Sequence, residues 1–255
     1  MNYTEINAAV WDELAASGYE WTRPVSHEEY LAAKDGELTM YLTPSKAVPR
    51  AWFPKLRGAR VLGLASGGGQ QGPIFAAHGA EVTIMDISSA QLDAETLSAR
   101  REGYEVTTVK ADMTREFPFA DEAFDLIFHP VANNYIEDIS HVWRECYRVL
   151  KAGGVLLAGF AKEELFMFEH DKSKSPPIAV ANPLPYNPLR NPELLERENG
   201  RVGHGYCFSH TLEEQLGGQL AAGFTLTGIY DDRDRSGVFA KYMNTYAATR
   251  AVKPK

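Results

Sequence analysis

The sequence of 255 residues predicts an α/β fold in which strands and helices alternate around a mainly parallel sheet. Two observations carry this prediction. From about residue 60 to residue 160, short apolar runs alternate with helical patterns, which is typical of parallel strands joined by right-handed crossovers. Near the C-terminus, residues 224–230 and 238–247 read as two strands separated only by the charged turn 231–237, so they must pair antiparallel.

The first strand, residues 61–64, runs directly into a turn that contains Gly67, Gly68, Gly69 and Gly72. Glycine has no Cβ and tolerates positive φ, so such a backbone can come close to a ligand. The helix that follows offers unpaired N–H groups in its first turn. The segment therefore predicts a turn that binds a nucleotide.

The later segments predict the other strands of the sheet. The strand at residues 81–86 ends in Asp86, whose carboxylate can accept two hydrogen bonds from a ribose diol. Ser88 and Gln91 form a capping-box pattern, which predicts a helix to about Arg101. Three more strands are expected at residues 106–110, at residues 124–129, and after a Gly153-Gly154 turn that ends a further helix.

Two classes of cofactor fit the glycine-rich turn taken alone. The pattern Gly67-x-Gly69-x-x-Gly72 satisfies the dinucleotide fingerprint, and Asp86 lies 19 residues after Gly67, near the spacing of a ribose-binding acid. The order of the later motifs favours the other class. With Asp112-Met113, the Gly153-Gly154 turn and the C-terminal hairpin, the chain resembles class I methyltransferases that use S-adenosyl-L-methionine. The segment from Leu64 to Gly72, LASGGGQQG, also resembles a bacterial group of methyltransferase-like proteins.

The resemblance implies a Rossmann-like seven-stranded mixed sheet with helices on both faces. It also implies that Asp86 binds the ribose, that Ile87 lies against the adenine, and that Asp112 and Met113 contact the adenine ring. The full set of cofactor-binding residues that it implies is Ala65, Ser66, Gly67, Gly68, Gly69, Gln70, Gln71, Asp86, Ile87, Gln91, Asp112, Met113, His129 and Pro130.

Gly63 departs from the family pattern, because the family commonly has an acid there that organises the site around the methionine amino group. The sequence leaves three outcomes open. Gln70 or Gln71 substitutes for the acid, a later insert does so, or affinity for the cofactor is lost.

The sequence also offers candidate residues for catalysis and for acceptor binding. His129 ends a strand at the edge where ligands of open α/β sheets bind, so it is a candidate general base; the alternative is a histidine that only bonds backbone. Asn133 and Asn134 either bind substrate or form a turn. Aromatic residues either line the pocket or cover the sheet. The candidate substrate residues are Trp21, Tyr41, Asn133, Asn134, Tyr186 and His204.

Composition narrows the partners. A net charge of −8 argues against a broad nucleic-acid surface, which needs clustered Lys and Arg. With two cysteines, no secretory signal and no membrane-length apolar run, a reduced, cytoplasmic protein is expected. The motif His204-x-x-Cys207-x-x-His210 has ligand-like spacing but no evident fourth ligand, so no metal is expected. The oligomeric state is not indicated.

The predicted organisation is an N-terminal helical cap at residues 1–57 and a methyltransferase domain at 58–255. The cap contains helical patterns at residues 8–16 and, after a capping box at Ser26, to about Lys34. The domain carries an insert at 161–205, which holds six of the 14 prolines and is read as a lid. The predicted function is methyl transfer from S-adenosylmethionine to a small molecule. The alternatives are an NAD-dependent oxidoreductase and an S-adenosylmethionine-binding protein without transferase activity.

Overall fold

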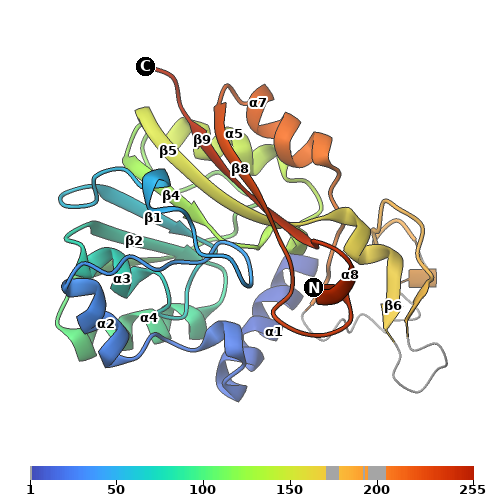
Figure 1. Cartoon of the computed structure of the whole chain (residues 1–255), viewed down its shortest axis with the longest axis horizontal. Helices are drawn as coiled ribbons and strands as arrows, with labels where there is room; N and C mark the ends of the chain where they lie inside the picture. The colour runs from blue at the N-terminus through green and yellow to red at the C-terminus, as the bar shows by residue number, and fades with distance from the viewer. Residues whose placement is uncertain (1, 171–177, 192, 195–204) are drawn as a thin grey trace.

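A computed structural model describes residues 2–170, 178–191, 193–194 and 205–255. Its centre is a seven-stranded sheet in the order β3-β2-β1-β4-β5-β9-β8 (Figure 1). The first five strands in the chain are parallel, and β9 runs antiparallel to both β5 and β8. The predicted mixed sheet with an antiparallel C-terminal pair is therefore confirmed. The strands are β1 (Arg60–Leu64), β2 (Glu81–Asp86), β3 (Val106–Lys110), β4 (Phe124–His129), β5 (Leu150–Ala161), β8 (Thr225–Asp232) and β9 (Tyr246–Val252).

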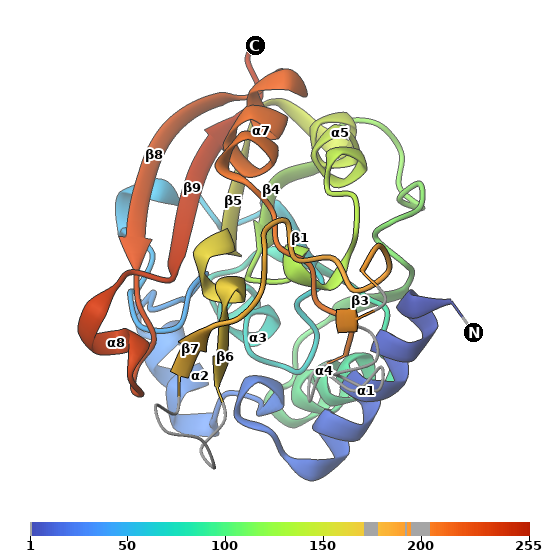
Figure 2. The same cartoon turned by 90° about the vertical axis from the view of Figure 1, so that its right-hand side faces the viewer.

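Helices cover both faces of the sheet (Figures 1 and 2). On one face, α5 and α7 pack over a core that includes the fully buried Trp143 and Cys146. On the other face, α3 and α4 pack over a core that includes Phe75 and Phe128. The helices are α1 (Tyr3–Ser17), α2 (His27–Lys34), α3 (Gly72–Ala77), α4 (Ser89–Glu102), α5 (Ser140–Val149), α7 (Gly218–Ala221) and α8 (Phe239–Tyr242).

Shorter elements connect these layers. A π-helical turn precedes α7, and a small hairpin lies outside the main sheet. No helix among the described residues is long and apolar enough to cross a membrane. The short elements are 3-10 turns at Glu20–Thr22, Arg50–Trp52, Asn133–Tyr135 and Glu163–Met167, the π-helical turn Glu213–Gly217, and the hairpin strands β6 (Phe168–His170) and β7 (Ile178–Val180).

The N-terminal helices start where side chains can cap them. The capping box of Ser26 and Glu29 is present, and α2 ends at Lys34 as predicted. The first helix begins five residues earlier than expected, because Asn2 and Glu5 form a capping box of their own. Asp12 of α1 accepts hydrogen bonds from Ser88 Oγ at 2.6 Å and from the backbone N–H of Ala90 at 3.0 Å. The first helix is thereby joined to the start of α4.

The last strand lies further along the chain than the sequence indicated. The run 238–247 was expected to be a strand, but it contains α8, and β9 begins only at Tyr246. Phe239, one of the aromatic residues that looked strand-like, instead packs on Phe168 of β6 with ring centroids 5.1 Å apart. The following run of small residues forms the strand, since Ala248 is fully buried between β5 and β8.

Candidate functional site

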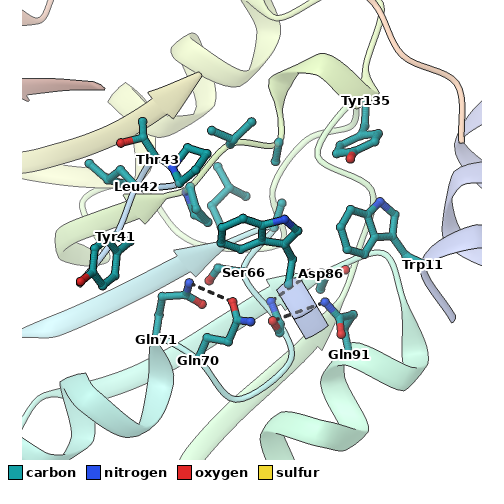
Figure 3. A pocket seen from close by; sticks show the side chains of 18 of the residues that line it. Trp11, Tyr41, Leu42, Thr43, Ser66, Gln70, Gln71, Asp86, Gln91 and Tyr135 are labelled. Atoms are coloured by element: carbon teal, nitrogen blue, oxygen red, sulfur yellow. Dashed lines mark hydrogen bonds between the residues drawn. The ribbon is translucent and has the colours of Figure 1, made fainter. Parts of the chain in front are cut away.

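A cavity of about 1000 Å³ opens at the carboxyl edge of β1, β2 and β4. This is the edge at which open α/β sheets bind their ligands. Its floor is the glycine-rich turn between β1 and α3, together with the residues that follow β2 and β3. Its other walls come from the N-terminal segment, from the segment that follows β4, from residues 165–166 and from the turn between β8 and β9. Figure 3 shows labelled side chains from several of these segments around the cavity.

The glycine-rich turn is held from below by hydrogen bonds to its backbone. Gly67 N donates to Asp86 Oδ2 at 3.0 Å, Gly68 N to Gln91 O at 2.9 Å, and Gly69 N to Glu95 Oε2 at 2.9 Å. The space at these positions is small: a Cβ on Gly67 would lie 2.7 Å from Gln91 Cβ. The helix α4 and the end of β2 therefore fix the path of the turn, and Gly67 is required by the close approach.

Asp86 is bonded to backbone on both of its oxygens. Oδ1 accepts from Ser88 N at 2.9 Å, while Oδ2 accepts from Gly67 N. Burial raises the pKa of Asp86, and these N–H groups oppose that rise by stabilising the carboxylate. Each carboxylate oxygen has a second lone pair, so the side chain can still accept from a ribose hydroxyl.

Glu95 is a second acid beneath the turn, and the sequence did not single it out. Its side chain is fully buried and accepts from Gly69 N and from the hydroxyl of Tyr104 at 3.0 Å. Burial raises the pKa of Glu95 to about 7. A Cβ at Gly72 would lie 1.9 Å from Glu95 Oε1, so a larger residue at position 72 would displace this carboxyl group.

Unpaired polar atoms mark the cavity as a place for a polar ligand. Within the described part of the chain, five buried side-chain atoms lack a hydrogen-bond partner, and four of them belong to residues that line this cavity. Each such atom costs about 1–3 kcal/mol unless water or a ligand pairs with it. The cavity thus fits a ligand with several polar groups, as S-adenosylmethionine has. The four atoms are Ser66 Oγ, Gln71 Oε1, Gln91 Oε1 and Asn134 Oδ1.

The structure places most of the predicted cofactor residues in the cavity wall. Gly68, Gly69 and His129 are the predicted cofactor residues that are not part of it. The two glycines support the turn without lining the cavity, and both have positive φ, at 101° and 74°. Those that do line it are Ala65, Ser66, Gly67, Gln70, Gln71, Asp86, Ile87, Gln91, Asp112, Met113 and Pro130.

His129, the predicted general base, lies outside the wall of the cavity. Its side chain is fully buried and does not line the cavity. Nδ1 lies 3.0 Å from Leu64 O and Nε2 lies 2.8 Å from Asn133 Oδ1, so both ring nitrogens are engaged. Burial lowers the pKa of His129, which leaves the ring neutral. This arrangement agrees with the alternative of a histidine that bonds backbone. The ring contacts the carbonyl oxygen of Leu64, at the end of β1 just before the glycine-rich turn.

The candidate substrate residues divide between the wall and the interior. Trp21, Tyr41 and Asn134 line the cavity. Asn133 is fully buried outside the wall, bonded to His129 and to Gln215 Oε1, so its predicted contact with substrate is not supported. Tyr186 is also buried outside the wall, and its ring packs on Phe166 with centroids 5.7 Å apart. His204 lies outside the described residues.

Several wall residues were missed because their neighbours come from distant parts of the chain. Trp11 of α1 meets Tyr135 edge to face with ring centroids 5.4 Å apart, and both line the cavity (Figure 3). Arg235, read only as part of a charged turn, places its guanidinium 4.8 Å above the ring of Trp21 and 5.7 Å above that of Tyr41. The aromatic residues of the N-terminal segment indicated a candidate pocket wall. No pattern in the neighbouring sequence indicated that Arg235 would pack on them.

Trp52 has a different place from Trp21 and Tyr41. Its ring packs on Tyr230 of β8 with centroids 5.2 Å apart, and a Cβ on Gly228 would lie 2.7 Å from its ring. Trp52 therefore covers the sheet, which was one of the two alternatives predicted for the aromatic residues.

Comparison with known proteins identifies the family. Residues 62–158 match the sequence model of the methyltransferase domain. The chain is 42% identical over 248 residues to a Bacillus subtilis protein named uncharacterized methyltransferase YbaJ, covering 97% of both chains. Its fold is similar to that of an S-adenosylmethionine-dependent methyltransferase from Mesorhizobium loti, at 17% identity and a TM-score of 0.60, over 80% of this chain and 94% of that one.

A second solved structure, a putative S-adenosylmethionine-dependent methyltransferase from Listeria monocytogenes, aligns with a TM-score of 0.61 at 15% identity, over 81% of this chain and 95% of that one. These two structures show similarity of fold, whereas the sequence identity to YbaJ along 97% of both chains shows membership of the family. With the strand order and the cavity at the carboxyl edge, they lead to one assignment. The chain belongs to the class I methyltransferases, the family that takes its methyl group from S-adenosylmethionine.

Proposed function

We propose that this protein transfers the methyl group of S-adenosylmethionine to a small-molecule acceptor held in the same cavity. One observation carries the proposal: a single cavity joins the polar floor at the glycine-rich turn to a wall rich in aromatic residues. The floor suits the cofactor and the aromatic wall suits an acceptor of limited size. The LASGGGQQG turn is the basis for proposing membership of a narrower bacterial group of methyltransferase-like proteins.

We propose that the residues of the floor bind the cofactor. Asp86 presents an oxygen atom beside Gly67 and Gln91 has an unpaired Oε1, and these oxygens would accept from the ribose hydroxyls. Ile87 and Met113 supply apolar contact for the adenine, and Asp112 supplies an acceptor for its amino group. The positions of these side chains in the wall support this assignment.

When bound, S-adenosylmethionine supplies an electrophilic methyl group on a positively charged sulfur. Such a transfer needs chiefly that donor and acceptor be held in line and that water be kept out. The residues of this chain would serve those two tasks. Asp86 and the glycine-rich turn fix the cofactor, and the aromatic residues of the wall fix the acceptor and exclude water.

The acceptor is inferred from the other half of the wall. Several aromatic side chains line it, among them Trp11, Trp21, Tyr41, Tyr135 and Phe166. Aromatic walls suit a compound that is at least partly apolar. The net charge of −8 disfavours a nucleic acid as the acceptor.

We also propose that two segments close the cavity: the cap at residues 1–57 and the insert at residues 161–205, of which 171–177, 192 and 195–204 lie outside the described residues. In the cap, Trp21 and Tyr41 reach the wall, and in the insert Leu165 and Phe166 do so. The connection of Asp12 to Ser88 supports this role for the cap, because it holds α1 beside the end of β2.

The test uses S-adenosylmethionine carrying an isotope-labelled methyl group and a bacterial cell extract separated by ultrafiltration. We expect label to enter a compound in the low-molecular-weight filtrate, with one S-adenosylhomocysteine formed per methyl transferred. Label found only in retained protein or nucleic acid would overturn the small-molecule proposal. Binding of S-adenosylmethionine without turnover in either fraction would favour a cofactor-binding protein instead.

A further inference from the structure

Two unpaired oxygen atoms lie at the two ends of the glycine-rich turn. They are Ser66 Oγ and Gln71 Oε1, and neither has a hydrogen-bond partner among the described residues. The side chains are nonetheless buried, with exposed fractions of 4% for Ser66 and 8% for Gln71. Figure 3 shows both directed into the cavity, on the side away from Gln91. A fold that leaves such atoms unpaired loses free energy unless a ligand or water supplies the missing partner.

The chemistry of these atoms selects the partner. Gln71 Nε2 lies 3.5 Å from Gln70 Oε1, which orients the amide so that its oxygen is the free atom. An amide oxygen only accepts hydrogen bonds, and a serine hydroxyl can accept as well. The ligand group must therefore be a donor. A primary ammonium group, with three N–H donors on one nitrogen, can satisfy both oxygens at once.

The end of β1 leaves no room for a carboxylate beside these oxygens. A Cβ on Gly63 would lie 2.4 Å from Ser66 Oγ and 2.5 Å from Ile84 Cδ1. The Ser66 hydroxyl therefore already fills the space that a side chain at position 63 would need. Any cationic group at this end of the cavity would meet the neutral oxygens of residues 66 and 71.

We propose that Ser66 and Gln71 bind the ammonium group of the methionine part of S-adenosylmethionine through uncharged oxygen atoms. The proposal rests on the proposed function, since it takes the cofactor as the ligand of the floor. Recognition by neutral oxygens predicts a different response to an added charge than an ion pair would. Because the recognising groups are neutral, a carboxylate introduced at position 71 adds an attraction to the ammonium group that the natural protein lacks.

The experiment measures binding of three ligands by calorimetry at low salt. The ligands are S-adenosylhomocysteine, its analogue without the amino group, and 5′-methylthioadenosine, which lacks the whole amino-acid part. We expect the natural protein to bind S-adenosylhomocysteine about tenfold more tightly than the deaminated analogue, the effect of losing a charge-assisted hydrogen bond. Gln71→Met and Ser66→Ala should each reduce that preference and leave methylthioadenosine binding unchanged.

Gln71→Glu is the deciding variant, because it keeps the shape of the side chain, adds a charge and loses only the long 3.5 Å contact from Nε2 to Gln70 Oε1. We expect it to bind S-adenosylhomocysteine severalfold more tightly at low salt, with the gain shrinking as salt increases. Ser98→Ala is the matched control for Ser66→Ala, because the Ser98 hydroxyl is also buried but donates to Ala94 O of its own helix. That control should leave all three affinities unchanged.

The possible failures are distinguishable. If the natural protein bound neither S-adenosylhomocysteine nor methylthioadenosine, the proposed function itself would be wrong. Equal affinity for S-adenosylhomocysteine and its deaminated analogue would overturn the ammonium assignment alone. Weaker binding of S-adenosylhomocysteine by Gln71→Glu would also overturn it, because that result would place the cofactor carboxylate at residue 71. If Gln71→Glu did not fold, Ser66→Ala with the deaminated analogue would decide the question.

Discussion

The carboxylate of Asp86 accepts a hydrogen bond from the backbone N–H of Gly67, with 3.0 Å between Oδ2 and the nitrogen. This bond joins the end of β2 to the turn that follows β1, two segments whose strands are neighbours in the sheet. Asp86 thus has two tasks: it shapes the turn, and it presents its remaining lone pairs to the cavity.

Replacing Asp86 by alanine should therefore affect both binding and stability. We expect Asp86→Ala to weaken S-adenosylhomocysteine binding at least about tenfold, since charge-assisted bonds contribute about 1.5–3 kcal/mol. The lost bonds to Gly67 N and Ser88 N should also lower the free energy of unfolding by about 1–3 kcal/mol. Calorimetric titration and denaturant unfolding measure the two effects. Glu81→Ala, at the exposed start of β2, is the control; an unchanged dissociation constant in Asp86→Ala would show that this acid does not bind the ribose.

Glu95 makes the stability depend on pH near neutrality. Its pKa is about 7 in the folded protein, against 4.5 ordinarily. Below pH 4.5 the carboxyl group is protonated in both states. Between 4.5 and about 7, the unfolded chain has lost a proton that the folded chain retains, so the contribution of Glu95 to stability falls as pH rises, by up to about 3 kcal/mol.

Glu95→Gln removes this titration. The variant should lose less stability than the natural protein between pH 5 and pH 8, by up to about 3 kcal/mol in the free energy of unfolding. Unfolding in urea at several pH values provides the measurement, and Glu105→Gln at an exposed position provides the control. Parallel pH profiles for Glu95→Gln and the natural protein would contradict the assignment.

Asp12 ties the cap to the cofactor floor. Because Asp12 accepts from Ser88 Oγ and Ala90 N, Asp12→Ala should cost about 0.5–2 kcal/mol of stability, the range for loss of a helix cap. It should also weaken S-adenosylhomocysteine binding, since Ser88 follows Asp86 and Ile87 directly. Thermal unfolding and calorimetry test this against Glu13→Ala, an exposed neighbour on the same helix. If both variants behaved alike, α1 would not be fastened through Asp12.

The close packing at the end of β1 can be tested by adding one methyl group. Gly63→Ala would place a Cβ 2.4 Å from Ser66 Oγ, so we expect a loss of about 1–3 kcal/mol in the free energy of unfolding. Gly217→Ala is the matched change in a helical turn, where the added Cβ would lie at an ordinary 3.6 Å from Glu213 Cγ. That variant should be neutral or stabilising. Similar unfolding curves for the two variants would contradict the crowding at Gly63.

The sequence predicted what depends on local pattern. The strands that end at Leu64, Asp86 and His129 were evident because buried parallel strands are short apolar runs and their ends carry glycine or polar residues. The last strand was misplaced, because the aromatic run before it has the stronger strand preference. The residues of β9 are small because they pack between neighbouring strands, as the full burial of Ala248 shows. The segment alone does not reveal which strands will pack beside it.

The site could be predicted only in its half nearest the glycine-rich turn. His129 was taken as a base because its strand ends at the ligand edge, yet its side chain turns inward to Leu64 O and Asn133. Whether a side chain at a strand end points into the core or into the cavity depends on its hydrogen-bond partners, which can lie far away in the sequence. The same holds for Arg235 over Trp21, which lie more than 200 residues apart in sequence.

Calorimetric titration with S-adenosylhomocysteine and, separately, with NAD tests whether the cavity binds S-adenosylmethionine rather than a dinucleotide. The cavity, the bonded Asp86 and the strand order lead us to predict saturable binding of S-adenosylhomocysteine by the natural protein and no heat of binding with NAD. Tight binding of NAD with no response to S-adenosylhomocysteine would contradict the account.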